Sequence, residues 1–475
     1  MLNKKQSYYL LFTLCLFSRA FTSIYYMEDI DSLRFAFSLQ DFDVTKLQPH
    51  FPGYAVFCLA GNIIFFITNS MGMTFSIIGG ISVFTIIHYI IKICRVDLNT
   101  RIGFFCASLV FLNPIIWLMS NRYMPDLLGL SISIAALYYL IEENNKFKYL
   151  LKGFLLTGLL AGTRLSYVPI LCIPFLYQLI NHKKRATLFL IFSFGFLIWL
   201  IPLIWVTGIG PLYDAAMIHT QGHFTNFGGT IITESDWLLR LTNLLKGIWA
   251  DSLGGYWPGR SWQTIVLSFS LLYLLKLGLI GLRKYYKFDK NLKLIIFSVI
   301  IYFLWIFFFQ NVIHKSRHVL PLLIIIFIIL VLGQKYVLNP KDIILNLILS
   351  LYFISAISIT TKLVLQHKNP SAISQLKNSI KDIPSNSSII SIPLINYYLK
   401  SHGINANFIN VESTDQIENF KFKNLQNTYL IGNFNHIKFE KYFLTEESVF
   451  FHNPYVNRMW PVIKKYSVME KNNGT

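Results

Sequence analysis

The chain has 475 residues, of which 54% are hydrophobic and only 14% are charged, against about 25% charged in an ordinary soluble domain. With a mean hydropathy of +0.50 and 41 Phe and 26 Tyr, most of the chain could not bury its apolar surface in a water-soluble fold. This composition indicates a multi-span membrane protein and excludes coiled-coil, collagen-like, disordered and disulfide-scaffold classes. The five cysteines lie in apolar segments, so we expect small buried residues rather than disulfide or metal partners.

Stretches of about 20 mostly apolar residues predict transmembrane helices along residues 1–363. Residues 149–181 are too long for one span and contain Gly162, Arg164 and two prolines, so we expect two short helices that meet near Arg164. We expect the apolar segment 54–68 to lie flat at the membrane surface, because counting it as a span would put basic and acidic loops on one side. The other predicted spans, which bring the total to about eleven, are 8–27, 73–93, 102–120, 126–141, 186–207, 262–282, 292–310, 319–336 and 342–363.

The distribution of basic residues predicts which side each loop faces. Eighteen Lys and Arg fall in short loops on one side, whereas the longer loops on the other side hold only nine. The positive-inside rule makes the first side cytoplasmic, so the N-terminus is predicted to be cytoplasmic and the C-terminus external. Much of the net charge of +19 then comes from basic residues in cytoplasmic loops, which set the orientation of the chain in the membrane. We therefore expect a multi-pass protein of the plasma membrane, in contact with membrane lipids, and no nucleic-acid partner.

Three polar regions are predicted to face the external side. Two are loops of the membrane domain 1–363, at 28–72 and 208–261. The third is the tail 364–475, in which short apolar runs alternate with helical patterns such as 372–380. This alternation predicts a small extracytoplasmic α/β domain.

The first external loop carries the densest group of acids in the chain. It begins with Glu28, Asp29 and Asp31, and five acids fall within sixteen residues although the chain has only 23. Carboxylates at a membrane boundary are costly unless they are solvated, paired or functional. If residues 30–40 form a short helix, Asp31 and Arg34 share a face, and the carboxylate could act as a general base. The alternative is a solvated acidic loop.

Further along the same loop, two prolines and a glycine surround His50 and Tyr54. This spacing predicts a rigid turn that could form the wall of a site. The alternative is a simple turn with a surface histidine.

Together, these features resemble the GT-C glycosyltransferases, and most closely the branch that contains protein O-mannosyltransferases and the lipid A aminoarabinose transferase. The resemblance covers roughly residues 1–340, and it rests on the order of the motifs and their common external placement. The motifs are the acidic start of the first loop, the turn before Tyr54, the segment Asn121-Arg122-Tyr123-Met124-Pro125-Asp126, Gly162-Thr163-Arg164, His219-Thr220-Gln221-Gly222-His223-Phe224, and Arg317-His318-Val319-Leu320-Pro321.

The resemblance implies transfer of a sugar from a polyprenyl-phosphate donor to a hydroxyl of a lipid, glycan or protein acceptor, with inversion, at the external face. It also implies an acidic base in the first loop. Asp31 matches that position best, with Asp29 and Glu28 as fallbacks. Where the family usually has an acidic pair, this chain has Asp31-Ser32. The resemblance leaves room for a divalent cation, and we predict no other cofactor.

Cations on the external side would bind the phosphate leaving group, for which the planar guanidinium of arginine is well shaped. Arg317 ranks first because residues 314–318 pack several cations together, although each cation alone could simply extend from the membrane to the interface. His219 and His223 could share a helical face as metal ligands, but we expect them to line the donor or acceptor cleft. The residues predicted to bind substrate are Arg317, Lys315, His318, His50, Tyr54, Asp126, Arg122, Arg164, His219, His223 and Arg260.

Two other functions fit a multi-span chain with charged residues at its membrane edges. One is a transporter or flippase of lipid-linked sugars, and the other is a non-catalytic membrane scaffold. The lack of a recognisable inverted repeat, the scarcity of acids in mid-span and the size of the external domain favour the transferase.

Overall fold

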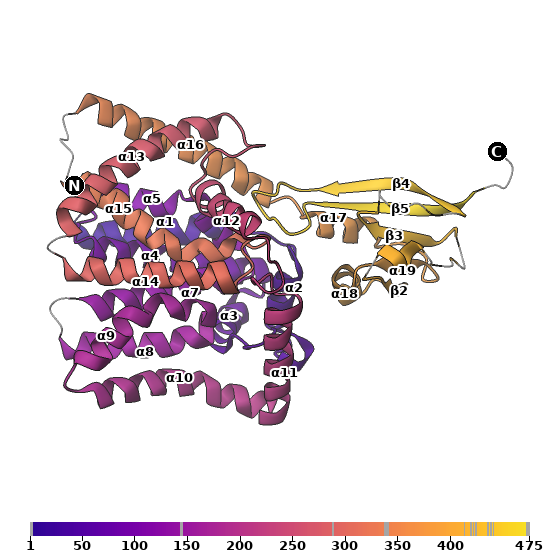
Figure 1. The fold of residues 1–475 in the computed structure, drawn as a ribbon, viewed down its shortest axis with the longest axis horizontal. Coiled ribbons are helices and arrows are strands. Elements are labelled where there is room, and N and C mark those ends of the chain that lie inside the picture. Colours follow the sequence, from indigo (N-terminus) through magenta and orange to yellow (C-terminus); the bar gives the residue numbers. More distant parts are fainter. Residues whose placement is uncertain are drawn as a thin grey trace. The chain divides into compact units, whose positions relative to one another are not determined.

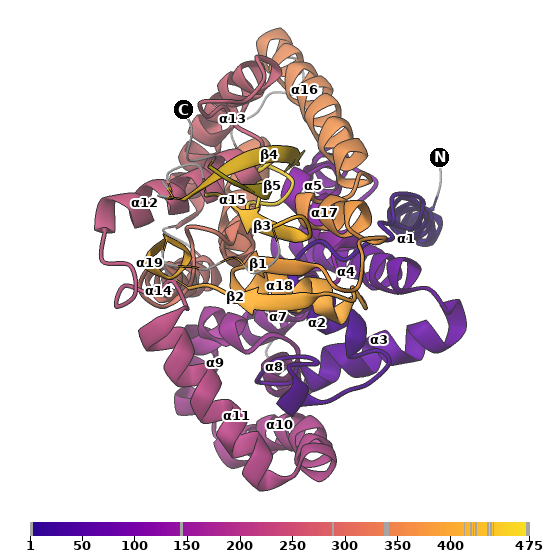
Figure 2. The same ribbon diagram turned by 90° about the vertical axis from the view of Figure 1, so that its right-hand side faces the viewer.

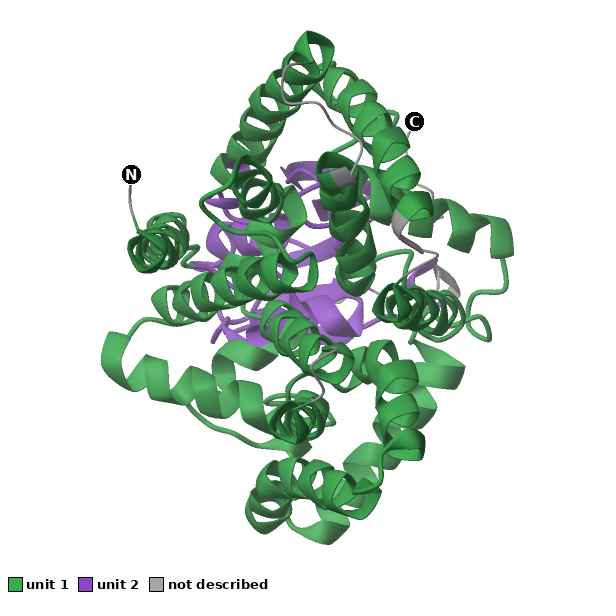
Figure 3. Ribbon diagram, turned by 90° about the vertical axis from the view of Figure 1, so that its left-hand side faces the viewer, with its two compact units in different colours: residues 1–25, 34–365 green, residues 26–33, 366–475 purple. Residues whose placement is uncertain are grey.

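The computed structural model describes residues 3–142, 146–286, 289–336, 342–412, 414–418, 420, 422, 425–434, 437, 439 and 441–471. It divides into two compact units, which Figure 3 shows in different colours. Unit 1 comprises Met1–Tyr25 and Arg34–Leu365, and unit 2 comprises Tyr26–Leu33 and Gln366–Thr475. The second unit therefore includes eight residues from the start of the first predicted loop.

Unit 1 is a bundle of apolar helices, in which α7, α8 and α10 pack side by side (Figures 1 and 2). Its helices are α1 (Lys4–Phe21), α3 (Ala55–Thr68), α4 (Met71–Ile93), α5 (Arg101–Phe111), α6 (Pro114–Asn121), α7 (Asp126–Ile141), α8 (Phe147–Arg164), α9 (Cys172–Asn181), α10 (Arg185–Thr207), α11 (Ile209–Gln221), α12 (Trp237–Lys246), α13 (Gln263–Tyr286), α14 (Lys290–Phe309), α15 (Leu323–Tyr336) and α16 (Ile343–His367), whose last two residues belong to unit 2. Short helical turns are η1 (Val44–Lys46), η2 (Leu165–Leu171), η3 (Gly222–Asn226), η4 (Gly247–Ser252) and η5 (Ser316–Leu322).

Within the described residues, seven helical stretches are long and apolar enough to cross a membrane, or eight if α5 and α6, bent by 54°, count as one span. The predicted multi-span helical class is thus confirmed, and each predicted span has a helix. The count of about eleven and the flat placement of α3 stay predictions.

Residues 147–181 form two helices, α8 and α9, joined by η2 directly after Arg164. The rings of Phe154 in α8 and Phe175 in α9 lie 4.4 Å apart between centroids. Because these residues lie on opposite sides of Arg164, the contact shows that the chain folds back at this point. The expected pair of short helices is therefore present.

Loops that were predicted to be cytoplasmic meet at one end of unit 1. Lys4 forms an ion pair with Asp97 at 2.8 Å, and Nζ of Lys335 donates to the carbonyl of Cys94 at 3.0 Å. These contacts join the start of α1 and the end of α15 to the connection between α4 and α5. Since α7 has 16 residues and a helix rises 1.5 Å per residue, the opposite end of the bundle, where α7 begins, is about 24 Å away.

Unit 2 contains a five-stranded sheet with the order β2-β1-β3-β5-β4. Strands β1 to β3 are parallel, and β5 is antiparallel to both β3 and β4. Helix α17 packs on β4 and β5, and α18 packs on β1 and β2. The elements are α17 (Ala372–Ser379), β1 (Ser388–Ser391), α18 (Pro393–Ser401), β2 (Asn407–Asn410), α19 (Thr414–Glu418), β3 (Thr428–Gly432), β4 (Tyr442–Phe451) and β5 (Val462–Glu470).

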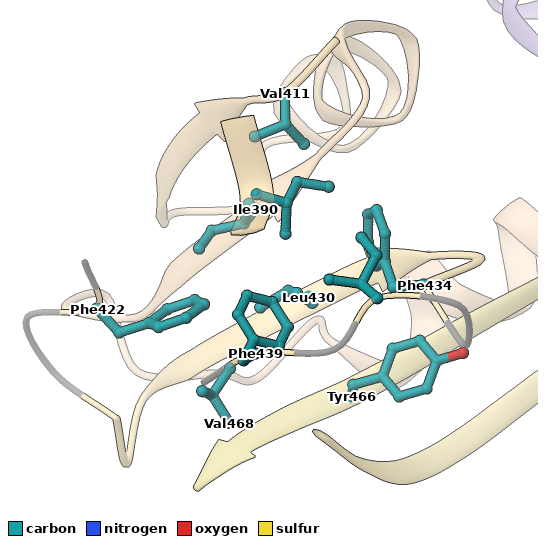
Figure 4. Close-up of a cluster of buried hydrophobic side chains, with 10 residues drawn as sticks. Ile390, Val411, Phe422, Leu430, Phe434, Phe439, Tyr466 and Val468 are labelled. Atoms are coloured by element: carbon teal, nitrogen blue, oxygen red, sulfur yellow. The ribbon is translucent and has the colours of Figure 1, made fainter. Parts of the chain in front are cut away.

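The core of unit 2 lies between the sheet and the segments that follow β2 and β3. Figure 4 shows Ile390 and Leu430 from adjacent strands beside Phe422, Phe434 and Phe439. Burial of these side chains on a mixed sheet agrees with the small C-terminal α/β fold that the alternating pattern predicted.

Helix α2 (Ile30–Phe37) crosses the boundary between the units. Its first four residues belong to unit 2, and the residues from Arg34 onward belong to unit 1.

Candidate functional site

At the end of unit 1 where α7 begins, a buried carboxylate is shared by two arginines. Oδ1 of Asp126 lies 2.9 Å from Nη2 of Arg164 and 3.7 Å from Nε of Arg317. Asp126 is fully buried, and the two arginines are only 6% and 7% exposed. Three charges in such a place are costly unless they are paired or functional. Helices α7 and α8 and the turn η5, which are distant in sequence, each contribute one member.

A tyrosine and a glycine fix this arrangement. The hydroxyl of Tyr167 lies 3.3 Å from Oδ1 of Asp126 and 3.2 Å from the carbonyl of Arg317, so it links α7 to η5. Gly129 lies one turn after Asp126, and a Cβ atom at this position would be 2.6 Å from Cβ of Arg164. The glycine therefore leaves the space through which the Arg164 side chain approaches the carboxylate.

The turn before α3 extends the cluster. Nη1 of Arg164 donates to the hydroxyl of Tyr54 at 3.2 Å, and this hydroxyl lies 3.2 Å from Nε2 of His50. Gly53 has a φ of +85°, and a side chain there would contact Leu203, so the tight turn requires glycine. The predicted rigid turn thus carries His50 and Tyr54 to the arginine cluster.

Three histidine rings form a stacked row that begins in this turn. The ring of His50 stacks on that of His219 with centroids 5.1 Å apart, and His219 stacks on His223 at 6.4 Å. Nε2 of His223 is 2.9 Å from the carbonyl of Phe309. Burial lowers the pKa of His223, and the nearby cations Lys315 and Arg164 lower it further, against the effect of the Phe309 hydrogen bond. Neutral His223 is therefore favoured at this position.

The first-loop acids belong to a different environment, in unit 2. Asp29 caps helix α2, because its Oδ1 accepts a hydrogen bond from the backbone N–H of Ser32 at 2.9 Å. Its Oδ2 accepts from Nδ2 of Asn457 at 3.3 Å. Asp29 is 2% exposed, and both of its oxygens hold structure in place.

Glu28 is also held within unit 2. Its Oε1 lies 3.3 Å from Nε2 of His367, and both side chains are almost fully buried. The hydroxyl of Tyr26 donates to the backbone carbonyl of His367 at 2.7 Å, and that of Tyr398 donates to the carbonyl of Met27 at 2.6 Å. These contacts hold residues 26–28 within unit 2.

Asp31 is the second residue of α2, and its side chain is 6% exposed. A carboxylate in the first turn of a helix interacts favourably with the helix dipole. On the same helix, one turn later, the ring of Phe35 packs against Tyr54 and His50, with centroids 5.0 and 5.9 Å away. Along α2, Asp31 therefore follows the capping residue Asp29 and precedes Phe35.

The other predicted residues divide into two groups. Lys315 and His318 flank Arg317 at the start of η5, where the carbonyl of His318 accepts from the hydroxyl of Tyr302 at 2.9 Å. Arg122 and Arg260 form the second group: Nη1 of Arg122 is 3.7 Å from Sδ of Met119, and Arg260 donates to the carbonyls of Ala250 and Gly255 in its own loop.

Sequence reasoning did not select Tyr167, His367 or Asn457. Tyr167 had a weak signal, since it follows Arg164 by three residues at a predicted helix break. His367 and Asn457 lie more than 330 residues after the acids they contact, and no local spacing could have identified them. In the described part of the chain, no three His, Cys, Asp or Glu side chains are grouped to hold a metal ion.

No protein-family model matches this sequence. A comparison with curated proteins also finds no match.

Solved structures with a similar fold do exist. ArnT from Cupriavidus metallidurans, bound to undecaprenyl phosphate, has a TM-score of 0.56 at 9% identity, over 96% of this chain and 97% of that one. The oligosaccharyltransferase from Archaeoglobus fulgidus, tethered to an acceptor peptide with the sequon NVT, has a TM-score of 0.50 at 11% identity, over 90% of this chain and 69% of that one. The similarity confirms the predicted fold, which this chain shares with both structures.

Proposed function

We propose that this protein is a membrane glycosyltransferase that moves a sugar from a polyprenyl-phosphate donor to an acceptor hydroxyl at the external face, with inversion. The observation that carries the proposal is the buried cluster of Asp126, Arg164 and Arg317. Among the described residues, Oδ2 of Asp126 and Nε of Arg164 have no hydrogen-bond partner. Buried polar atoms in this state are rare in native proteins and are typical of sites that bind a ligand or water.

The two arginines suit the donor's phosphate. A guanidinium is always charged and binds phosphate oxygens through paired N–H donors. Arg317 and its neighbour Lys315 would stabilise the charge that develops on the leaving phosphate. Asp126 would keep the guanidinium of Arg164 in place, and its second oxygen would accept a hydrogen bond from a sugar hydroxyl.

Asp31 is the proposed base. Its carboxylate takes the proton from the acceptor hydroxyl as the acceptor oxygen forms a bond to the anomeric carbon. The bond from that carbon to the phosphate oxygen breaks, and the electron pair leaves with the polyprenyl phosphate. Attack from the face opposite the phosphate inverts the anomeric centre.

Support for this reaction class comes from the fold that the chain shares with two transferases. ArnT was solved with undecaprenyl phosphate, which is the product that a polyprenyl-phosphate donor leaves behind. The acceptor bound to the oligosaccharyltransferase is a peptide. For this chain, the acceptor class stays open among lipid, glycan and protein.

The test is product analysis. The purified full-length protein would be reconstituted in liposomes with a panel of polyprenyl-phosphate sugars and candidate acceptors, and the products identified by mass spectrometry. We expect a glycosylated acceptor together with free polyprenyl phosphate. A lipid-linked sugar that changes leaflet without cleavage would instead establish a flippase.

A further inference from the structure

Within unit 2, a continuous series of hydrogen bonds connects the C-terminal residues to the segment 26–33. The series begins at the start of α17, where the backbone N–H of Ala372 donates to Nδ1 of His452 at 3.1 Å. Nδ1 is therefore an acceptor, and Nε2 of the same ring must carry a proton if it is to donate to the carbonyl of Asn457, 2.8 Å away. His452 thus fixes the loop between β4 and β5 at Asn457.

The orientation of the Asn457 amide is also fixed. Its Oδ1 accepts from the backbone N–H of Met459 at 2.9 Å, so its Nδ2 is the atom that faces Oδ2 of Asp29 at 3.3 Å. Asp29 in turn caps α2 through Ser32. Asn457 is 5% exposed and Asp29 is 2% exposed, so water competes little for this contact.

We infer that Asn457 is a positioning residue for the transfer reaction: it holds the carboxylate of Asp29, which sets the first turn of α2 and thereby the direction of the Asp31 carboxylate. This inference rests on the proposed function, in which Asp31 is the base. It assigns a task to the C-terminal unit, namely to orient the acidic segment at the start of the first loop. Because a misplacement of about 1 Å at a reacting group can cost about 100-fold in rate, a buried contact that fixes the helix start is a strong control on turnover.

The geometry allows the amide and the carboxylate to be exchanged between positions 29 and 457. In Asn457→Asp, a carboxylate oxygen faces that of Asp29, and the two repel each other. In Asp29→Asn, the new amide still caps α2 through its oxygen, but its NH₂ group then faces the NH₂ group of Asn457. The double variant Asp29→Asn with Asn457→Asp restores one amide-to-carboxylate hydrogen bond in the same place, with the donor and acceptor exchanged.

The experiment measures kcat and the donor KM for wild type, both single variants and the double variant, in liposomes. We expect each single variant to lower kcat by about tenfold or more, with the donor KM changed by less than about threefold because the phosphate-binding cations lie in unit 1. The double variant should recover most of kcat. A matched control is Asn396→Ala, which removes another buried amide of unit 2, bonded to Ser391, Ile409 and Asn410, and should leave kcat unchanged in correctly folded protein.

A second measurement distinguishes a failure of the positioning role of Asn457 from a failure of the proposed transferase function. Hydrogen exchange of the Ser32 and Leu33 amides should be faster in each single variant and slow again in the double variant, whether or not the protein transfers sugar. If exchange follows this pattern and Asp31→Asn is inactive, but the single variants keep wild-type kcat, the positioning role is wrong and the transferase stands. If exchange does not respond to the single variants, the contact does not hold α2 and the inference is overturned. If wild type transfers no sugar, the proposed function fails first.

Discussion

Arg164 and Asp126 form a buried ion pair, 2.9 Å between Nη2 and Oδ1, at the point where the chain reverses between α8 and α9. The guanidinium also bonds Tyr54 from the first loop, so one arginine joins two of the motifs on which the sequence resemblance rests. A membrane domain retains such a group when it is used. This pair is therefore the centre of the site that we propose for the donor's phosphate.

Removal of Arg317 should weaken use of the donor. Arg317→Ala is expected to cost about 1.5–3 kcal/mol in donor binding, the value of a charge-assisted hydrogen bond. Asp126 stays paired with Arg164 in this variant, so the fold should persist. Arg317→Lys should rescue only part of the loss, because the paired N–H geometry is absent. The readout is transfer rate at limiting donor, with Lys46→Ala, an exposed cation paired with Asp41, as the control. Wild-type activity in Arg317→Ala would exclude this residue as the phosphate ligand.

Gly129 tests the geometry of the cluster without the removal of a charge. In Gly129→Ala, the new methyl group meets Cβ of Arg164 at 2.6 Å, so α7 and Arg164 must shift relative to each other, which disturbs the ion pair with Asp126. We expect kcat/KM for the donor to fall by about 10–100-fold. Gly210→Ala adds the same methyl group in α11 with no atom within 4 Å and should be neutral. A fully active Gly129→Ala protein would show that the position of Arg164 does not matter for transfer.

Much of this architecture could be predicted from the sequence, for reasons that are local. Apolar run length defined the membrane helices, and Gly162, Arg164 and the following prolines marked the reversal between α8 and α9. Asp126, Arg164 and Arg317 could be selected because charges at the ends of apolar segments are rare. The contact of both arginines with the Asp126 carboxylate could not be predicted, since it depends on how α7, α8 and η5 pack.

The different contacts of the first-loop acids could also not be predicted from the sequence. Glu28, Asp29 and Asp31 are chemically similar and adjacent. They are distinguished by Asn457 and His367, residues more than 330 positions away. For Arg122 and Arg260, the contacts with Met119, Ala250 and Gly255 that the structure shows likewise had no sign in the sequence, and their predicted substrate-binding role stays a prediction.

The stability of unit 2 should depend on the ionisation of His402. Burial lowers the pKa of His402, and Lys377 lowers it further, against the effect of the hydrogen bond from its ring to the Tyr398 carbonyl. A histidine whose folded pKa lies below its unfolded value of about 6.5 contributes stability above that pH, and this stability is lost as the pH falls through the folded pKa. We expect the melting temperature of wild type to fall between pH 7.5 and 5, and to fall less in His402→Gln. Equal pH dependence in the two proteins would contradict this assignment.

The predicted topology can be tested by cysteine labelling, because native Cys15, Cys58, Cys94 and Cys106 are buried and Cys172 is half-buried. Cysteines introduced at the exposed positions Ser235 and Asn386 should react with an impermeant maleimide in intact cells. One at Asn181, also exposed but at the end of α9, which is predicted to be cytoplasmic, should react only after permeabilisation. Labelling of Asn386→Cys only in permeabilised cells would place unit 2 in the cytoplasm and contradict an external site.

The most direct measurement of the central claim is the turnover of Asp31→Asn with its donor affinity determined separately. The amide keeps the shape of the side chain but cannot accept the acceptor's proton, and loss of a general base usually costs about 10²–10⁴-fold in rate. We expect turnover to fall within this range while donor affinity changes little, because the proposed phosphate ligands are other residues. Glu28→Gln and Asp29→Asn should each retain more activity than Asp31→Asn. If all three variants transfer sugar at the wild-type rate, the first loop is only structural and the proposed transferase mechanism is contradicted.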